Sequence, residues 1–153
     1  GTIVGEPARE LIAEHRAETG EGSLDGSPVV FVQRLIARSI EKHEAARPGL
    51  NTIYDRGLPD CVAYARVSGV DDAAALSAAE SRRYSCPIFI APPWEDIYTM
   101  DDMRRATFAQ VTAFHHELVA IYQQLGYEMV GLPKTTVAER VETIAQRLQP
   151  DDC

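Results

Sequence analysis

The chain has 153 residues, of which 45% are hydrophobic and 25% charged, and its formal net charge is −8. This length and composition fit one globular domain, and the negative charge disfavours a broad nucleic-acid surface. No apolar run approaches the roughly 20 residues of a membrane-spanning helix, so we expect neither nucleic acid nor membrane among the partners. Three cysteines without paired or metal-ligand spacing, and no signal-peptide pattern, predict a cytoplasmic protein: Cys61, Cys86 and Cys153.

The first half of the chain alternates short apolar runs with helical patterns. The patterns predict strands over residues 2–4 and 52–54, and helices over residues 8–17, 29–46, 59–67 and 71–83. The first strand ends at Glu6-Pro7, and proline is favoured in the first turn of the helix that follows.

The second half continues the alternation. A strand over residues 88–91 is stopped by Pro92-Pro93, and Gly126 ends a helix predicted over residues 106–125. A strand over residues 128–132 and a last helix over residues 135–148 follow. Strands that alternate with helices of this length predict an α/β fold with a mainly parallel sheet.

Residues with a possible functional role follow each of the four predicted strands. They are Glu6, Asp55-Arg56, Pro92-Pro93-Trp94 and Pro133-Lys134. In an open parallel sheet, ligands bind beyond the carboxyl ends of the strands. We therefore expect these four endings to lie along one edge and to mark the functional site.

Asp55 and Arg56 are the strongest functional candidates among these strand endings. The Asp55 carboxylate could hold a Mg²⁺-bound water or accept a proton from an attacking hydroxyl, and Arg56 could bind a phosphate through two hydrogen bonds. Glu6 is a candidate general base. The alternative for all three is structural: helix capping and a surface ion pair.

Two arginines, Arg104 and Arg105, precede the helix predicted from residue 106. Paired arginines on a lid could stabilise the charge of a transferring phosphoryl group, whereas the alternative is an ordinary solvated helix start. The adjacent His115 and His116 point to different faces of a helix, and we interpret them as structural.

Several blocks together resemble one family. They are Tyr54-Asp55-Arg56-Gly57-Leu58-Pro59-Asp60 with Tyr64, Ala91-Pro92-Pro93-Trp94-Glu95-Asp96-Ile97-Tyr98, Arg104-Arg105-Ala106-Thr107-Phe108, and Leu132-Pro133-Lys134. The chain resembles, over essentially its whole length, the predicted AAA-type ATPases, P-loop proteins related to the NadR-type ribosylnicotinamide kinase and to the deoxynucleoside kinases.

The resemblance implies a three-layer P-loop kinase-like fold in a single domain over residues 1–153, with a lid near residues 92–105. It also implies Mg²⁺ and ATP or GTP. In position, Glu6 matches the catalytic base of the deoxynucleoside kinases. Asp55-Arg56 matches the acid–arginine pair of these enzymes, and Arg104 and Arg105 match their lid arginines. Arg9, Tyr64 and Trp94 would bind substrate, and Pro133-Lys134 would lie along the adenine ring.

The sequence departs from the family pattern at one point: it contains no G-x-x-x-x-G-K-[ST] motif. Without that loop the β- and γ-phosphates lack their usual cradle. We expect the loop and its strand to precede residue 1, and the alternative is a truncated, catalytically inactive relative.

The sequence thus predicts a kinase that transfers the γ-phosphoryl group to a small, nucleoside-like hydroxyl. The first alternative is a nucleotide-binding regulatory or interaction module with weak or no catalysis. The second is a binding protein that lacks the phosphate loop.

Overall fold

The computed structural model describes residues 1–20, 27–85, 87–99 and 106–148. The chain divides into two compact units. Of the described residues, unit 1 comprises those within 1–82, and unit 2 comprises those within 83–99 and 106–148. The expectation of a single domain stays a prediction. No helix within the described ranges is long and apolar enough to cross a membrane.

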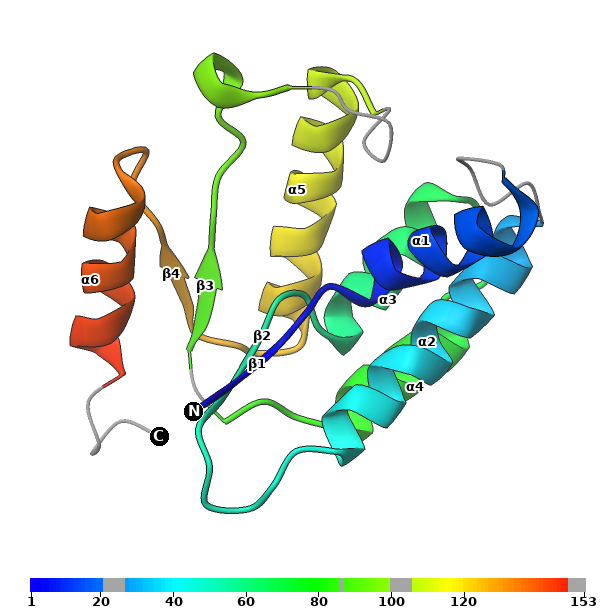
Figure 1. Cartoon of the computed structure of the whole chain (residues 1–153), viewed down its shortest axis with the longest axis horizontal. Coiled ribbons are helices and arrows are strands. Elements are labelled where there is room, and N and C mark those ends of the chain that lie inside the picture. The colour runs from blue at the N-terminus through cyan, green and yellow to red at the C-terminus, as the bar shows by residue number, and fades with distance from the viewer. Residues whose placement is uncertain (21–26, 86, 100–105, 149–153) are drawn as a thin grey trace. The chain divides into compact units, whose positions relative to one another are not determined.

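Unit 1 contains two strands and four helices (Figure 1). Their bounds are β1 Thr2–Val4, α1 Pro7–Thr19, α2 Pro28–Glu44, β2 Thr52–Tyr54, α3 Leu58–Val67 and α4 Ala73–Ser81. Strands β1 and β2 pair in parallel, with Val4 opposite Tyr54 at the end of the ladder. The helices pack on one another through α1–α2, α2–α3, α3–α4 and α2–α4 contacts.

The start of α1 and the core of unit 1 follow from the sequence. Pro7 stands at the first turn of α1 and needs no backbone N–H there. The core consists mainly of small and aliphatic side chains from the four helices, and Leu58 and Val62 of α3 are fully buried in it. Burial of such side chains is the main stabilising contribution to the fold.

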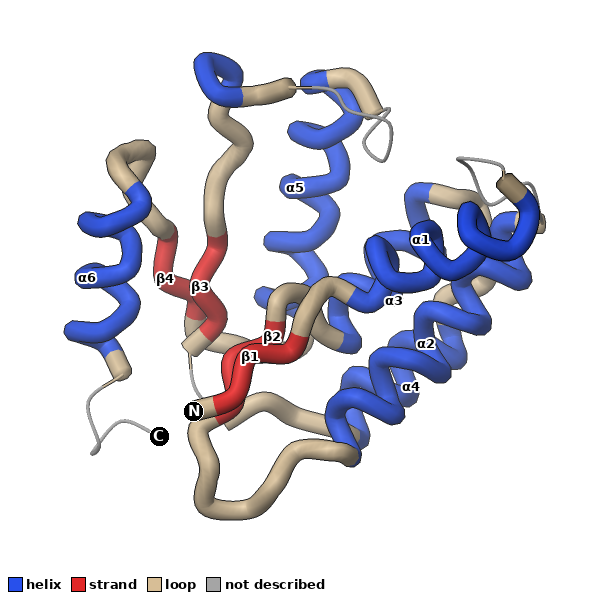
Figure 2. The backbone as a smooth tube through the Cα atoms, in the orientation of Figure 1, coloured by secondary structure: helices blue, strands red, loops and turns tan. Residues whose placement is uncertain are grey.

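Unit 2 contains two strands, two α-helices and one turn of 3₁₀ helix (Figure 2). Their bounds are β3 Ile88–Ile90, η1 Glu95–Ile97, α5 Phe108–Gln124, β4 Met129–Gly131 and α6 Val137–Arg147. Strands β3 and β4 pair in parallel with Ile90 opposite Gly131.

Local sequence signals set the helix ends of unit 2. Thr107 accepts a hydrogen bond from the Gln110 N–H while the Gln110 side chain accepts one from the Thr107 N–H, which is a capping box at the start of α5. Thr136 and Glu139 form the same arrangement at the start of α6. Gly126 follows α5 with φ of 72°, the left-handed conformation that glycine adopts without a steric penalty.

The α/β class and the parallel pairing of the strands are confirmed, and the helix bounds agree with the sequence expectation to within a few residues. The difference lies in the sheet. The described strands form two separate two-stranded ladders, β1–β2 and β3–β4, where the sequence predicted a single sheet. The three-layer arrangement and the lid remain predictions.

Candidate functional site

The carboxyl edge of the β1–β2 ladder brings together the first two of the predicted strand endings. The ladder ends at the Val4–Tyr54 pair, and beyond it the Asp55 N–H donates to the Val4 carbonyl oxygen at 2.8 Å. Glu6 follows β1 and Asp55-Arg56 follow β2, so both segments leave the ladder at the same edge. This is where open parallel sheets carry their ligand sites.

Glu6 occupies the N-cap position of α1, although its side chain makes no capping hydrogen bond. Its Oε2 instead accepts a hydrogen bond from Arg9 Nε at 3.0 Å, and 17% of the Glu6 side chain is exposed. A carboxylate beside the N-terminus of a helix is stabilised by the helix dipole. Glu6 and Arg9, both predicted site residues, therefore form one ion pair at the start of α1.

Lys42 of α2 holds the turn that leads to Glu6. Its ammonium group donates to the Gly5 carbonyl oxygen at 3.1 Å and to Glu10 Oε1 at 2.6 Å. No role for Lys42 was predicted from the sequence, because Lys42 does not belong to a glycine-rich phosphate-binding motif. In the structure Lys42 fixes the backbone at Gly5, the residue that precedes Glu6.

Arg56 adopts a left-handed backbone conformation with φ of 71°, which is unfavourable for a residue with a side chain. Its Nη1 donates to Asp60 Oδ1 at 3.1 Å. Burial lowers the pKa of Arg56, but the negative charges of Asp60, Tyr64 in its ionised form and Glu6 more than compensate, so that the pKa is raised overall. Arg56 is therefore held positively charged among acidic neighbours.

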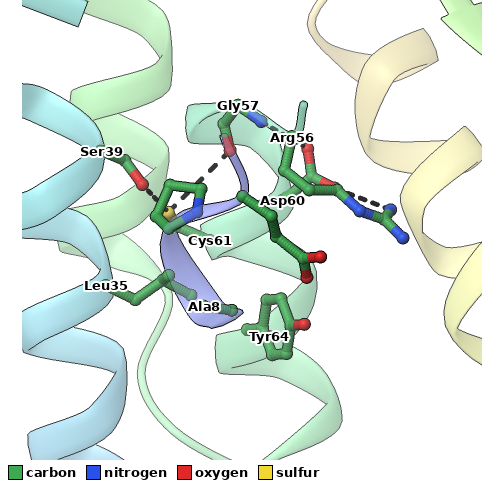
Figure 3. Close-up of a pocket in the computed structure, with 10 residues that line it drawn as sticks. Ala8, Leu35, Ser39, Arg56, Gly57, Asp60, Cys61 and Tyr64 are labelled. Atoms are coloured by element: carbon green, nitrogen blue, oxygen red, sulfur yellow. Dashed lines mark hydrogen bonds and ion pairs between the residues drawn. The ribbon is translucent and has the colours of Figure 1, made fainter. Parts of the chain in front are cut away.

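A small cavity lies beside Arg56, Asp60 and Tyr64 (Figure 3). Glu6, Arg56, Asp60 and Tyr64 contribute to its lining, but the surface that faces the cavity is almost entirely apolar. The cavity measures about 10 Å³, which is about the space one water molecule needs. In this conformation it is far too small for a nucleoside.

Two groups beside the cavity are held neutral by burial. Burial raises the pKa of the Tyr64 hydroxyl to about 12, and the charge of Glu6 adds to this effect. Burial likewise raises the pKa of the Cys61 thiol to about 12. The hydrogen bond between Cys61 Sγ and the Ser39 hydroxyl, at 3.4 Å, lowers this pKa but does not offset the effect of burial. At neutral pH Tyr64 is thus a hydrogen-bonding group and Cys61 a poor nucleophile.

The Asp55 carboxylate is exposed and makes no hydrogen bond or ion pair with any residue that the structure describes. Within the same ranges no three His, Cys, Asp or Glu residues gather into a metal cluster. Mg²⁺ retains several waters and commonly binds through one or two carboxylates together with substrate phosphates. A single exposed Asp55 fits that requirement, and the ion would supply charge neutralisation for a bound phosphate.

The remaining predicted endings lie together in unit 2. The Leu132 N–H donates to the Ile90 carbonyl oxygen at 2.8 Å, so Pro92-Pro93-Trp94 and Pro133-Lys134 leave the β3–β4 ladder at one edge. Trp94 is partly buried, and its Nε1 donates to Asp96 Oδ2 at 3.1 Å. Lys134 is exposed.

Two predictions cannot be placed. Arg104 and Arg105, the proposed lid arginines, lie outside the described residues. The segment predicted as a lid, residues 92–105, is described only as far as residue 99, where it contains the short helix η1.

The role of Asp60 was not predicted from the sequence. This residue belongs to the Asp55–Asp60 block but received no function of its own. Two signals point to it: it stands four residues after Arg56, and it is the third residue of a helix that follows Gly57. An acidic side chain at that position can reach back to the N-cap N–H.

The chain matches the protein family described as AAA domain over residues 1–140. It therefore belongs to this family of AAA-type P-loop proteins, a nucleotide-binding family whose members generally use Mg²⁺-nucleotide. No curated protein and no solved structure matches the chain.

Proposed function

We propose that this protein is a phosphotransferase that uses ATP or GTP to phosphorylate a small, nucleoside-like hydroxyl. The observation that carries the proposal is the parallel β1–β2 ladder, because it delivers Glu6 and Asp55-Arg56 to one edge. Two carboxylates and an arginine at such an edge are suited to proton transfer and to contact with a phosphoryl group. Membership of a nucleotide-binding family supplies the donor class.

The acceptor hydroxyl would lie between Glu6 and Asp55. Glu6 would orient or deprotonate it, and Asp55 would either take that proton or hold a metal-bound water. Arg56 and Arg9 would contact the substrate, with Tyr64 as a neutral hydrogen-bonding group. Phosphoryl transfer depends mainly on positioning and on stabilisation of developing charge, so side chains of these types suffice for the acceptor side.

Other predicted site residues would act on the nucleotide and on the substrate. Pro133 and Lys134 would contact the purine ring, and Trp94 would contact the substrate. Arg104 and Arg105 would stabilise the charge of the transferring phosphoryl group. Replacement of Arg105 by alanine should then lower turnover far more than nucleotide affinity, and equal small losses in both would contradict its assignment.

The experiment is a transfer screen with the full-length protein. Mg²⁺ with γ-labelled ATP or GTP is incubated with a panel of nucleosides, and labelled product is separated from nucleotide and phosphate. We expect label in at least one acceptor, and its loss in Asp55→Asn with nucleotide affinity retained. Label that appears only as inorganic phosphate across the panel would contradict the proposal.

A second candidate is a nucleotide-binding regulatory or interaction module. One observation favours it: the small volume of the cavity. This candidate predicts that Asp55→Asn leaves nucleotide-dependent partner binding intact. Loss of a phosphorylated product in that variant would argue against it.

A further inference from the structure

Asp60 is a buried carboxylate with only 3% of its surface exposed. A charge in such a position is costly unless it is paired and hydrogen-bonded. Asp60 meets this requirement with both oxygens, as Figure 3 shows: Oδ2 accepts from the Gly57 N–H at 3.0 Å, and Oδ1 accepts from Arg56 Nη1 at 3.1 Å.

The two contacts act on the same turn. The Gly57 N–H belongs to the peptide unit that follows Arg56, so Asp60 holds both the backbone after Arg56 and the Arg56 guanidinium. Arg56 is the only residue other than glycine, among those that the structure describes, with a positive φ. Such a conformation persists where its surroundings determine it, and it is often found at ligand sites.

The Arg56 side chain lines the small cavity together with Glu6 and Tyr64, and 40% of it remains exposed. A guanidinium carries five N–H donors in a planar fork and binds oxyanions best when that fork is held in place. The contact with Asp60 uses Nη1, one of the three nitrogens of that fork.

We propose that Asp60 is a positioning residue that orients the Arg56 guanidinium toward a phosphate-type oxyanion at the rim of the Glu6–Tyr64 cavity. This inference rests on the proposed function, because it concerns the same site. It adds to the site a residue that acts through Arg56, and it keeps the phosphate contact that the sequence predicted for Arg56.

The test is a double-mutant cycle with inorganic phosphate as the probe. The full-length protein and its Asp60→Asn, Arg56→Gln and double variants are titrated with phosphate, and binding is followed by the NMR signal of the Arg56 Nε–H or, where Arg56 is replaced, by backbone amides of residues 57–60. We expect Asp60→Asn to weaken phosphate binding about tenfold, which corresponds to about 1.4 kcal/mol. In the Arg56→Gln background the same change should have no further effect.

A matched control is available in the same unit. Arg66 and Asp72 form an ion pair at 2.6 Å, and neither residue lines the cavity. Asp72→Asn should therefore leave phosphate binding unchanged. A residue that acts through Arg56 needs Arg56 to be present, so an effect of Asp60→Asn that persists in the Arg56→Gln background would overturn the inference. No effect of Asp60→Asn in either background would overturn it as well.

A measurement on the unmodified protein covers the case in which Asp60→Asn does not fold. We expect slow exchange of the Arg56 Nη protons with one another, since the ion pair restricts rotation of the guanidinium. Free rotation would contradict the inference. The result is separate from the transfer screen: phosphate binding through Asp60 and Arg56 without acceptor phosphorylation would refute the kinase proposal alone.

Discussion

Helices α3 and α6 differ sharply in how their residues are buried. In α3, the stretch from Leu58 to Ala63 is buried without a break, and it includes Asp60 and Cys61 of the candidate site. In α6, no residue between Val137 and Arg147 is buried. The comparison indicates that unit 1 holds its site residues in a packed helical layer, whereas α6 depends on its capping box and its own backbone hydrogen bonds.

The largest expected effect is a core substitution in α3. Leu58→Ala should lower the free energy of unfolding by about 2–5 kcal/mol, because it removes a fully buried side chain and leaves a cavity. Urea unfolding followed by circular dichroism measures the change. Leu50→Ala, at a half-exposed position of the same unit, is the control and should cost less than about 0.5 kcal/mol.

The second-largest effect is expected at alkaline pH, where titration of Cys61 in α3 should lower the free energy of unfolding. Burial raises the pKa of Cys61 from 9.0 to about 12, so the unfolded chain releases this proton first and stability falls as the pH rises through that interval. The loss should be on the order of 2 kcal/mol between pH 9 and pH 11. Unfolding measured across this range should show a shallower decline in Cys61→Ala. An equal decline in both proteins would contradict the assignment.

The start of α6 should show a smaller effect. Thr136→Ala removes the acceptor for the Glu139 N–H and should cost about 1 kcal/mol of local helix stability. Hydrogen exchange of the α6 amides measures it. Thr143→Ala, in the middle of the same helix, is the control, and a larger effect there would indicate that the cap is not the main stabilising contact.

The smallest effect is expected on the apolar side of α6. Val141 is 57% exposed, so Val141→Ala should change the free energy of unfolding by less than about 0.5 kcal/mol. A loss above about 1 kcal/mol would show that Val141 packs against a surface in solution. That result would remove the contrast between α3 and α6.

The sequence predicted local features well. Pro7 and Gly126 carry signals that depend only on neighbouring residues, and helices begin and end close to them. Short apolar runs likewise placed the strands, and their alternation with helices predicted the parallel pairing. Which strands share a sheet depends on contacts between distant segments, and there the expectation of a single sheet differed from the two ladders observed.

The candidate site could be predicted in part. Glu6 and Asp55 could be placed at one edge because each directly follows a strand and the carboxyl ends of parallel strands lie at the same edge of a sheet. The roles of Asp60 and Lys42 could not be found in that way. Asp60 acts through a backbone conformation at Arg56, and Lys42 reaches Gly5 from a different helix, so both depend on the folded geometry.

The measurement that tests the central claim most directly is acceptor phosphorylation by Glu6→Gln in the full-length protein, with nucleotide affinity measured in parallel. Glutamine keeps the size of Glu6 but cannot accept a proton, so we expect transfer to fall about 100-fold or more while nucleotide affinity is unchanged. Transfer at the rate of the unmodified protein, or an equal loss of nucleotide affinity, would contradict the assignment of the β1–β2 edge as the acceptor site.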